Sequence, residues 1–200
     1  IALRKGYNLE AVRTHDINEI INDDGKSLIE YEISSPSKET IWILNAYLKK
    51  PTKDRKQSDK IRKKQVYKIA EIYKKLIAEG KTNVIIAGTF NAPSYCDSLS
   101  PLIQNTDLKD ITKHLSFDVD IDKGNDGTYF RLGAYRMGVN IKQKDYMFFS
   151  PALFNKMKDS GLNRKAMWPE KQPQWSIYKS VTNRNVAASE HPLVWGKVEL

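Results

Sequence analysis

The sequence predicts an α/β domain in which a long helix lies on a β-sheet, and three neighbouring segments carry this prediction. Residues 40–48 are predicted to form a strand that is too apolar to lie exposed at a sheet edge. Residues 58–78 have the apolar spacing of a helix, and residues 83–87 form an apolar strand directly after it. A strand, a helix and a strand in this order are typical of α/β folds.

The predicted helix has clear signals at both ends. Ser58 is the predicted N-cap, Asp59 suits the first turn, and Gly80 suits the stop. Apolar residues at spacings of three and four predict its buried stripe: Val66, Ile69, Ala70, Tyr73, Leu76 and Ile77. The lysines between them are expected to face solvent, namely Lys63, Lys68 and Lys75.

The remaining strands are shorter. Residues 27–33 are predicted to pair with residues 40–48 across a Ser-Pro-Ser turn. After Pro93, short strands alternate with long polar connections, at residues 128–131, 145–149 and 193–200. The connection over residues 169–186 has no clear period, and long irregular loops in compact domains are often functional.

Length and composition restrict the class of protein. Two hundred residues with 40% hydrophobic content suit one globular domain with a sizeable core. No apolar run approaches the roughly 18 residues that a membrane span needs. Cys96 is the single cysteine, so the chain forms no internal disulfide. Cysteine usage therefore does not distinguish an oxidising from a reducing cellular compartment. The first residues contain neither an initiator Met nor a signal peptide, so we expect a chain cut from a longer one.

Most of the positive charge lies in one segment, Lys49 to Lys64. It holds nine lysines and arginines against two aspartates, and so accounts for seven of the nine net positive charges. Such a segment can attract a phosphorylated substrate, a nucleic acid or a membrane surface. The alternative is a solvated loop and an outer helix face. The absence of aromatic residues within the run argues against stacking on single-stranded bases.

Polar residues at three predicted strand ends are candidates for a site. Thr89 and Asn91 follow the apolar strand 83–87 and are expected to share a face, because residues two apart in a strand point the same way. Asp145 begins a strand, and Glu190 with His191 leads into the last one. The structural alternatives are a turn cap for Asn91, a strand-end hydrogen bond for Asp145 and a satisfied interior histidine for His191.

The order and spacing of these motifs resemble the endonuclease/exonuclease/phosphatase superfamily, and more closely its bacterial phosphoesterase-like branch. The matching segments are Asn45 to Lys49 (family Asn-His-Leu-Lys-Ser), Arg62-Lys63-Lys64-Gln65 (Arg-x-x-Gln), Gly88 to Pro93 (Gly-Asp-Phe-Asn-x-x-Pro) and Ser189-Glu190-His191 (Ser-Asp-His). The resemblance implies a four-layer α/β sandwich, with two β-sheets packed face to face and helices on both outer sides. The family's first strands, which supply a metal-binding Glu and an Asn, have no counterpart here. We therefore expect one domain over residues 1–200 that lacks its N-terminal part and its first strands.

The resemblance also implies a chemistry, which is divalent-metal-dependent hydrolysis of phosphoesters, usually with Mg²⁺. In the family, the Asp and Asn of Gly-Asp-Phe-Asn orient water and hold the phosphate, and the final Asp-His pair presents an imidazolium to a phosphate oxygen. Carried over by position, the catalytic set is Thr89, Asn91, Asp145, Glu190 and His191. Glu190 and Asp145 are the weak metal-ligand candidates. The expected phosphate cleft is lined by Asn45, Tyr47, Asn91 and His191.

Three departures from the family pattern affect this chemistry. Thr89 stands where the family has the catalytic Asp, Glu190 adds a methylene to the terminal Asp, and Tyr47 stands where this branch often has His. We therefore expect Mg²⁺ to bind weakly or not at all and the chain to be weakly active or inactive. One alternative is a non-catalytic binding or scaffolding module on the same fold. Another is a sheet and a site completed by an upstream segment or a partner.

Overall fold

The computed structural model describes residues 2–18, 27–118, 129–132, 139–168, 177–189 and 191–200. Glu190 and much of the irregular loop 169–186 lie outside the described residues. No helix within the described ranges has both the length and the apolar character to cross a membrane.

The larger sheet has six strands in the order β1-β2-β3-β4-β9-β5. Their bounds are β1 Asn8–Asp16, β2 Ser27–Ser34, β3 Thr40–Tyr47, β4 Val84–Thr89, β9 Asp145–Phe149 and β5 Lys109–Asp110. β1, β2 and β3 form an antiparallel meander, and β3 pairs with β4 in parallel because helix α1 (Arg55–Ala78) crosses between them. β9 is antiparallel to both β4 and β5. The predicted strand–helix–strand unit is confirmed.

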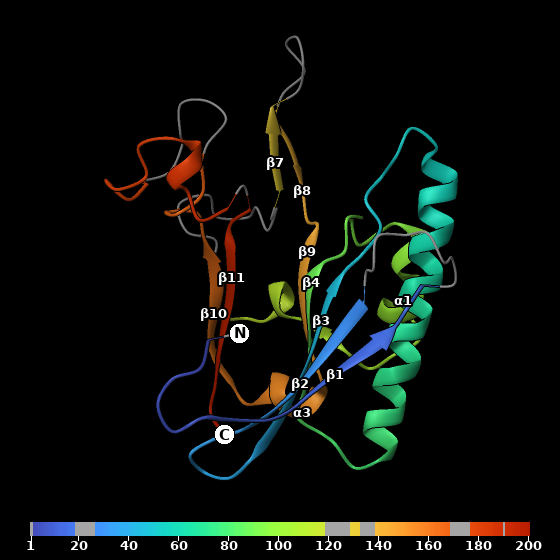
Figure 1. Cartoon of the computed structure of the whole chain (residues 1–200), viewed down its shortest axis with the longest axis vertical. Helices are drawn as coiled ribbons and strands as arrows, with labels where there is room; N and C mark the ends of the chain where they lie inside the picture. Colours follow the sequence, from blue (N-terminus) through green and yellow to red (C-terminus); the bar gives the residue numbers. More distant parts are fainter. Residues whose placement is uncertain (1, 19–26, 119–128, 133–138, 169–176, 190) are drawn as a thin grey trace.

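The second sheet has three strands in the order β11-β10-β6. β11 (Leu193–Val198) runs antiparallel to β10 (Met157–Asn163), and β10 runs parallel to β6 (Phe117–Asp118). A separate ribbon of β7 (Tyr129–Leu132) and β8 (Val139–Lys142) extends from one end of the molecule (Figure 1).

Helix α1 begins one turn earlier than the sequence predicts. Asp54 is the N-cap, because its Oδ1 accepts a hydrogen bond of 2.9 Å from the Gln57 amide. The prediction of Ser58 as the N-cap is wrong, since Ser58 lies inside the helix and donates its hydroxyl to the Asp54 carbonyl. The buried stripe is confirmed except at Ile77, which is half-buried, and Lys68 is half-buried rather than exposed.

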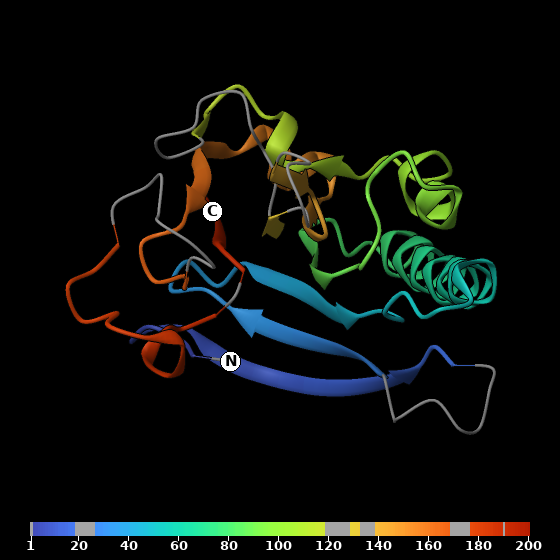
Figure 2. The ribbon, with the colours of Figure 1, turned by 90° about the horizontal axis from the view of Figure 1, so that it is seen from above.

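The elements stack as a helical layer, the six-stranded sheet and the three-stranded sheet, which are three of the four predicted layers (Figures 1 and 2). Alternation along the strands explains the packing. On β3 and β4, Leu44 and Ile86 join the core beneath α1. Their neighbours Ile43 and Ile85 point the other way, into the core shared with β11. Five short segments complete the described helical structure around these layers: α2 (Ser100–Ile103), α3 (Pro151–Asn155) and the 3₁₀ turns at Asp97–Leu99, Ile111–Lys113 and Arg184–Val186.

Arg62 differs in burial from the exposed residues of the basic segment Lys49 to Lys64. The prediction that this run lies on a loop and an outer helix face is wrong for Arg62, whose side chain is only 1% exposed. It shares a helix face with Gln65, Val66 and Ile69, which are also buried. The exposed members of the run are Lys50, Lys53, Arg55, Lys56, Lys60, Lys63 and Lys64.

Candidate phosphate site at the strand ends

Three adjacent strands bring polar side chains to one end of the six-stranded sheet. Tyr47 on β3 is in register with Thr89 on β4, and Thr89 is in register with Asp145 on β9. Paired residues in a sheet share a face, so the three side chains lie on the face that also carries Ile43 and Ile85. This face turns toward the second sheet, because Ile43 and Ile85 pack with Val194 and Val198 of β11.

Gly88 allows this close alignment of β3 and β4. Its φ is +141°, and a Cβ there would lie 1.9 Å from the Ala46 carbonyl oxygen. Only glycine combines that backbone conformation with so close an approach. The glycine of the motif thus positions Thr89 directly beside Tyr47.

Asp145 connects Thr89 to His191 through a short chain of hydrogen bonds. The Thr89 hydroxyl donates to Asp145 Oδ1 at 2.6 Å, and Asp145 Oδ2 lies 2.6 Å from His191 Nδ1. Because an ionised carboxylate only accepts hydrogen bonds, Nδ1 carries the proton in this contact. Asp145 therefore fixes the tautomer and the orientation of the imidazole.

These residues line a cavity of about 400 Å³ between the two sheets. Its polar edge is made by Thr89, Asp145, His191, Asn163 and Ser189. The rest of the wall is mostly apolar and includes Ala87, Met147, Ala166, Met167, Tyr178, Ala188, Pro192, Leu193 and Val194. A ligand with a charged group and an apolar portion would match this lining.

The other predicted site residues lie elsewhere. Asn91 follows the end of β4 with a left-handed φ of 56°, so strand alternation does not apply to it and the predicted shared face with Thr89 is wrong. Its amide donates 2.8 Å to the Leu48 carbonyl, and the residue is 7% exposed. Neither Asn91 nor Tyr47 lines the cavity. Asn45 is exposed on β3 in register with Ala87, and Tyr47 is 39% exposed at the end of β3.

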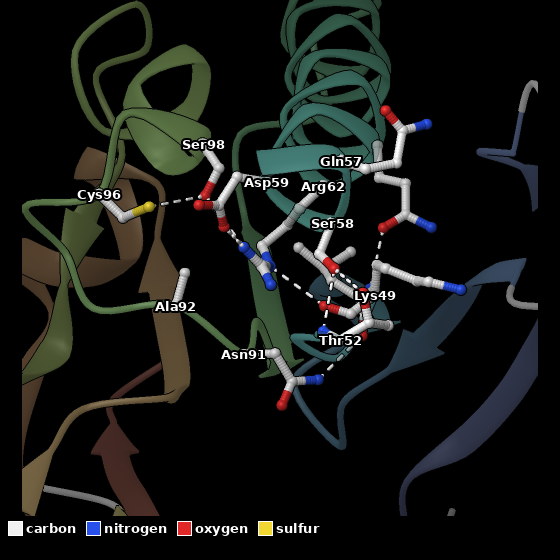
Figure 3. Close-up of polar contacts among 12 residues, drawn as sticks. Lys49, Thr52, Gln57, Ser58, Asp59, Arg62, Asn91, Ala92, Cys96 and Ser98 are labelled. Atoms are coloured by element: carbon white, nitrogen blue, oxygen red, sulfur yellow. Dashed lines mark hydrogen bonds and ion pairs between the residues drawn. The ribbon is translucent and has the colours of Figure 1, made fainter. Parts of the chain in front are cut away.

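The Arg-x-x-Gln motif holds the chain where it leaves β3 (Figure 3). Arg62 Nε donates to the Lys49 carbonyl at 3.1 Å, and the Lys49 amide donates to Gln65 Oε1 at 3.0 Å. Asn91 binds the preceding carbonyl, that of Leu48. We call Arg62, Gln65 and Asn91 the exit clamp, because together they fix the backbone between Tyr47 and the basic segment.

Among the described residues, the donor set at the site lacks the several oxygen ligands that a hard divalent cation prefers. Within the described residues, no three His, Cys, Asp or Glu side chains are grouped for metal binding. Asp145 already accepts hydrogen bonds at both oxygens, and the other predicted ligand, Glu190, lies outside the described residues. Mg²⁺ prefers several well-placed oxygen ligands. Thr89 supplies only a neutral hydroxyl, which donates a hydrogen bond to Asp145.

Sequence reasoning missed part of the cavity wall. Met167 and Tyr178 come from the irregular segment after β10, and a bridge between Met167 and Ser189 ties that segment to the stretch before β11. No periodic pattern marks these residues. Their one signal was the unusual length of a loop without a clear period.

Comparison with known proteins relates this architecture to solved structures. No protein-family model and no curated protein matches the sequence. The mannosyl-6-phosphatase of Bacteroides thetaiotaomicron matches with a TM-score of 0.65 at 14% identity, covering 98% of this chain and 68% of that one. An endonuclease/exonuclease/phosphatase from Bacteroides vulgatus matches with a TM-score of 0.59 at 14% identity, over 97% of this chain and 67% of that one.

A third match is Danio rerio TDP2, solved in complex with a single-strand DNA product. Its TM-score is 0.57 at 14% identity, and the match covers 93% of this chain and 66% of that one. The chain thus spans about two thirds of the length of each of these structures. The strand arrangement and these matches together show that the chain has the fold of the endonuclease/exonuclease/phosphatase structures.

Proposed function

We propose that the chain binds phosphoesters at the cavity between its two sheets, with His191 as the phosphate-binding group. The observation that carries this proposal is the Thr89–Asp145–His191 chain of hydrogen bonds at the cavity edge. An imidazolium held at Nδ1 by a carboxylate has its second N–H at Nε2, and this group can donate a charge-assisted hydrogen bond to a phosphate oxygen.

Turnover by this chain is expected to be weak or absent. Phosphoryl transfer depends on positioning and on stabilising charge in the transition state. When Mg²⁺ is bound in the family, it supplies that stabilisation, but the described residues offer no set of carboxylates to hold it. Asp145 and His191 can orient and bind the phosphate, and Thr89 can hold Asp145 in place.

Two functions of this site differ in whether the bound phosphoester is hydrolysed. The first is a weak metal-dependent phosphoester hydrolase, favoured by the retained Asp145–His191 pair. The second is a non-catalytic binding or scaffolding module, favoured by the hydroxyl of Thr89 in place of a carboxylate. A partner or an additional segment that completes the second sheet and adds carboxylates would favour the first.

Two classes of phosphoester suit the anion-binding character of this site. One structural match is named as a sugar phosphatase and another holds a single-strand DNA product. Phosphorylated sugars and nucleic acids both present the oxyanion that His191 would bind. The basic segment Lys49 to Lys64 suits either, because both are anionic.

Calorimetric titration with phenyl phosphate in EDTA tests binding without metal. We expect His191→Gln and Asp145→Asn to weaken the affinity at least about tenfold, the size of one lost charge-assisted hydrogen bond. His114→Gln is the matched control, because His114 is half-buried, bonds to Ser116 and does not line the cavity. Equal affinity for all four proteins would refute the site.

Hydrolysis of bis(p-nitrophenyl) phosphate with Mg²⁺ tests turnover. We expect a rate at or near background for the unmodified chain. Robust Mg²⁺-dependent cleavage that is lost in His191→Gln would instead establish the hydrolase function and overturn the prediction of an impaired site.

A further inference from the structure

A lysine and a tyrosine form a cationic surface beside the cavity. Lys50 Nζ lies 5.5 Å from the centroid of the Tyr47 ring, within the range of a cation–π contact. A hydrogen bond to Tyr47 raises the pKa of Lys50 above its ordinary value, so the ammonium keeps its charge. Both side chains are exposed. This pair offers a positive charge above an aromatic face, next to Thr89 in the sheet register.

The sheet register relates Tyr47 to Asp145. Tyr47 and Asp145 are separated by one strand, since β4 lies between β3 and β9. Neighbouring strands are about 4.8 Å apart, so the two residues are about 10 Å apart across the sheet. Tyr47, whose ring Lys50 overlies, therefore lies two strands from Asp145, the residue that holds His191.

The exit clamp keeps Lys50 in this place. Arg62 and Gln65 bind the carbonyl and the amide of Lys49, the residue directly before Lys50 (Figure 3). Arg62 is buried and belongs to the long helix α1. The backbone that carries Lys50 is thus anchored to rigid secondary structure, which favours a built subsite over a mobile surface lysine.

The positive charge continues beyond Lys50 along an exposed ridge. Five members of the run make no ion pair with any described carboxylate: Lys50, Lys53, Arg55, Lys56 and Lys60. The two aspartates inside the run are already engaged, Asp54 in capping α1 and Asp59 with Arg62. Uncompensated cations at this density attract a ligand that carries more than one negative group.

We propose that Lys50 and Tyr47 form a subsite for a second phosphate of the substrate, beside the phosphate held by His191. This inference rests on the proposed function and specifies its substrate, which is a compound with two or more phosphates. The second phosphate can come from the next residue of a nucleic-acid strand or from a small bisphosphate. The continuing ridge favours the strand.

Binding measurements in EDTA separate the subsite from catalysis. The probes are thymidine monophosphate, thymidine bisphosphate and a 5′-phosphorylated thymidine octamer, each titrated at about 50 and 200 mM salt. We expect Lys50→Gln to weaken the bisphosphate and the octamer about five- to tenfold and to leave the monophosphate unchanged. The slope of log affinity against log salt for the octamer should fall by about 0.7, the value for one phosphate contact on a single strand.

Lys74→Gln is the matched control. Lys74 is an exposed lysine on the same helix, about 28 Å beyond Arg55 at the rise of an α-helix, and it should leave all three affinities unchanged. Tyr47→Leu should weaken the bisphosphate less than Lys50→Gln does, because the charge remains. Thermal unfolding of each variant verifies the fold.

These measurements distinguish a nucleic-acid strand from a small bisphosphate as the source of the second phosphate. They also distinguish failure of the Lys50 subsite from failure of the proposed His191 site. A strand is supported if Lys53→Gln and Lys56→Gln weaken the octamer further without affecting the bisphosphate; a small bisphosphate is supported if neither change weakens the octamer. If Lys50→Gln leaves both multi-phosphate ligands unchanged, the subsite is overturned, whatever the phenyl phosphate titration gives. If phenyl phosphate fails to bind but Lys50 still controls the octamer, the proposed His191 site fails and the cationic subsite stands alone.

Discussion

Thr89 and Asp145 are joined across β4 and β9 by a hydrogen bond of 2.6 Å, in which the threonine hydroxyl donates to the carboxylate. The second oxygen of that carboxylate receives the Nδ1–H of His191. Asp145 therefore acts as a positioning residue for the imidazole, and Thr89 in turn orients Asp145. The threonine hydroxyl provides Asp145 with a hydrogen-bond donor and adds no negative charge to the site.

Replacing Thr89 with aspartate tests whether one substitution restores the family pattern. Two carboxylates at hydrogen-bond distance repel each other, and one of them takes up a proton. Because the described residues hold no further group of metal ligands, we expect Thr89→Asp to raise Mg²⁺-dependent turnover of bis(p-nitrophenyl) phosphate by no more than about tenfold. Thr89→Ser, which keeps the hydroxyl, is the control and should bind phenyl phosphate like the parent chain. Full activity in Thr89→Asp alone would show that a metal site is already complete.

The exit clamp predicts an unequal effect of two neighbouring basic residues on stability. Arg62→Lys should lower the free energy of unfolding by about 1–3 kcal/mol, since lysine cannot reproduce the fixed fork that contacts Lys49 and Asp59. Lys63→Ala removes only an exposed ion pair with Asp97 and should cost less than about 1 kcal/mol. Urea unfolding measures both. Equal losses would show that the clamp is not a stabilising element.

Asp110 predicts a pH dependence of stability. Burial raises the pKa of this carboxyl above its ordinary value, against the opposing hydrogen bonds from Gln143 and Thr112. The folded state therefore holds its proton to a higher pH than the unfolded state, and the stability contributed by that proton is lost as the pH rises through the raised pKa. Asp110→Asn should flatten the fall in unfolding free energy from about pH 4 upward. Identical urea midpoints across this range for both proteins would contradict it.

The first turn of α1 predicts a conflict between stability and binding. Arg55 and Lys56 place two cations at the positive end of the helix dipole, and the turn contains no acidic residue. Replacing both with glutamate should stabilise the fold by about 1 kcal/mol, measured by thermal unfolding. The same double variant should weaken binding of the thymidine octamer. A Lys74→Glu variant, which lies far from the helix N-terminus, provides the comparison for the change in net charge.

Periodicity predicted the elements of the fold that have strong local patterns. The strand 40–48, the helix and the strand 83–87 follow directly from the spacing of apolar residues. The start of the helix was misplaced because Asp54 and Ser58 are both good N-cap residues, and only the backbone geometry selects between them.

The site was predictable only through motif resemblance. Thr89, Asp145 and His191 are far apart in the sequence, and no local pattern brings them together. Asn91 does not share the face of Thr89, because its left-handed backbone lies beyond the end of β4. The alternation of side chains along a strand cannot predict this conformation. Charge counting also treated Arg62 as solvated, although its position on the face of Val66 and Ile69 indicated burial. The cavity wall after β10 depends on tertiary placement of an aperiodic segment.

The bond between the Lys49 amide and the Gln65 side chain makes that amide proton a local reporter. Its exchange with solvent requires the loop to separate from α1, because its acceptor lies on the helix and not on a neighbouring strand. Strand exit and helix should therefore open together as one cooperative unit, with similar exchange rates. A ligand seated on Lys50 would slow this exchange, so isotope labelling at a single backbone position would register occupancy of the Lys50 subsite even when no product forms.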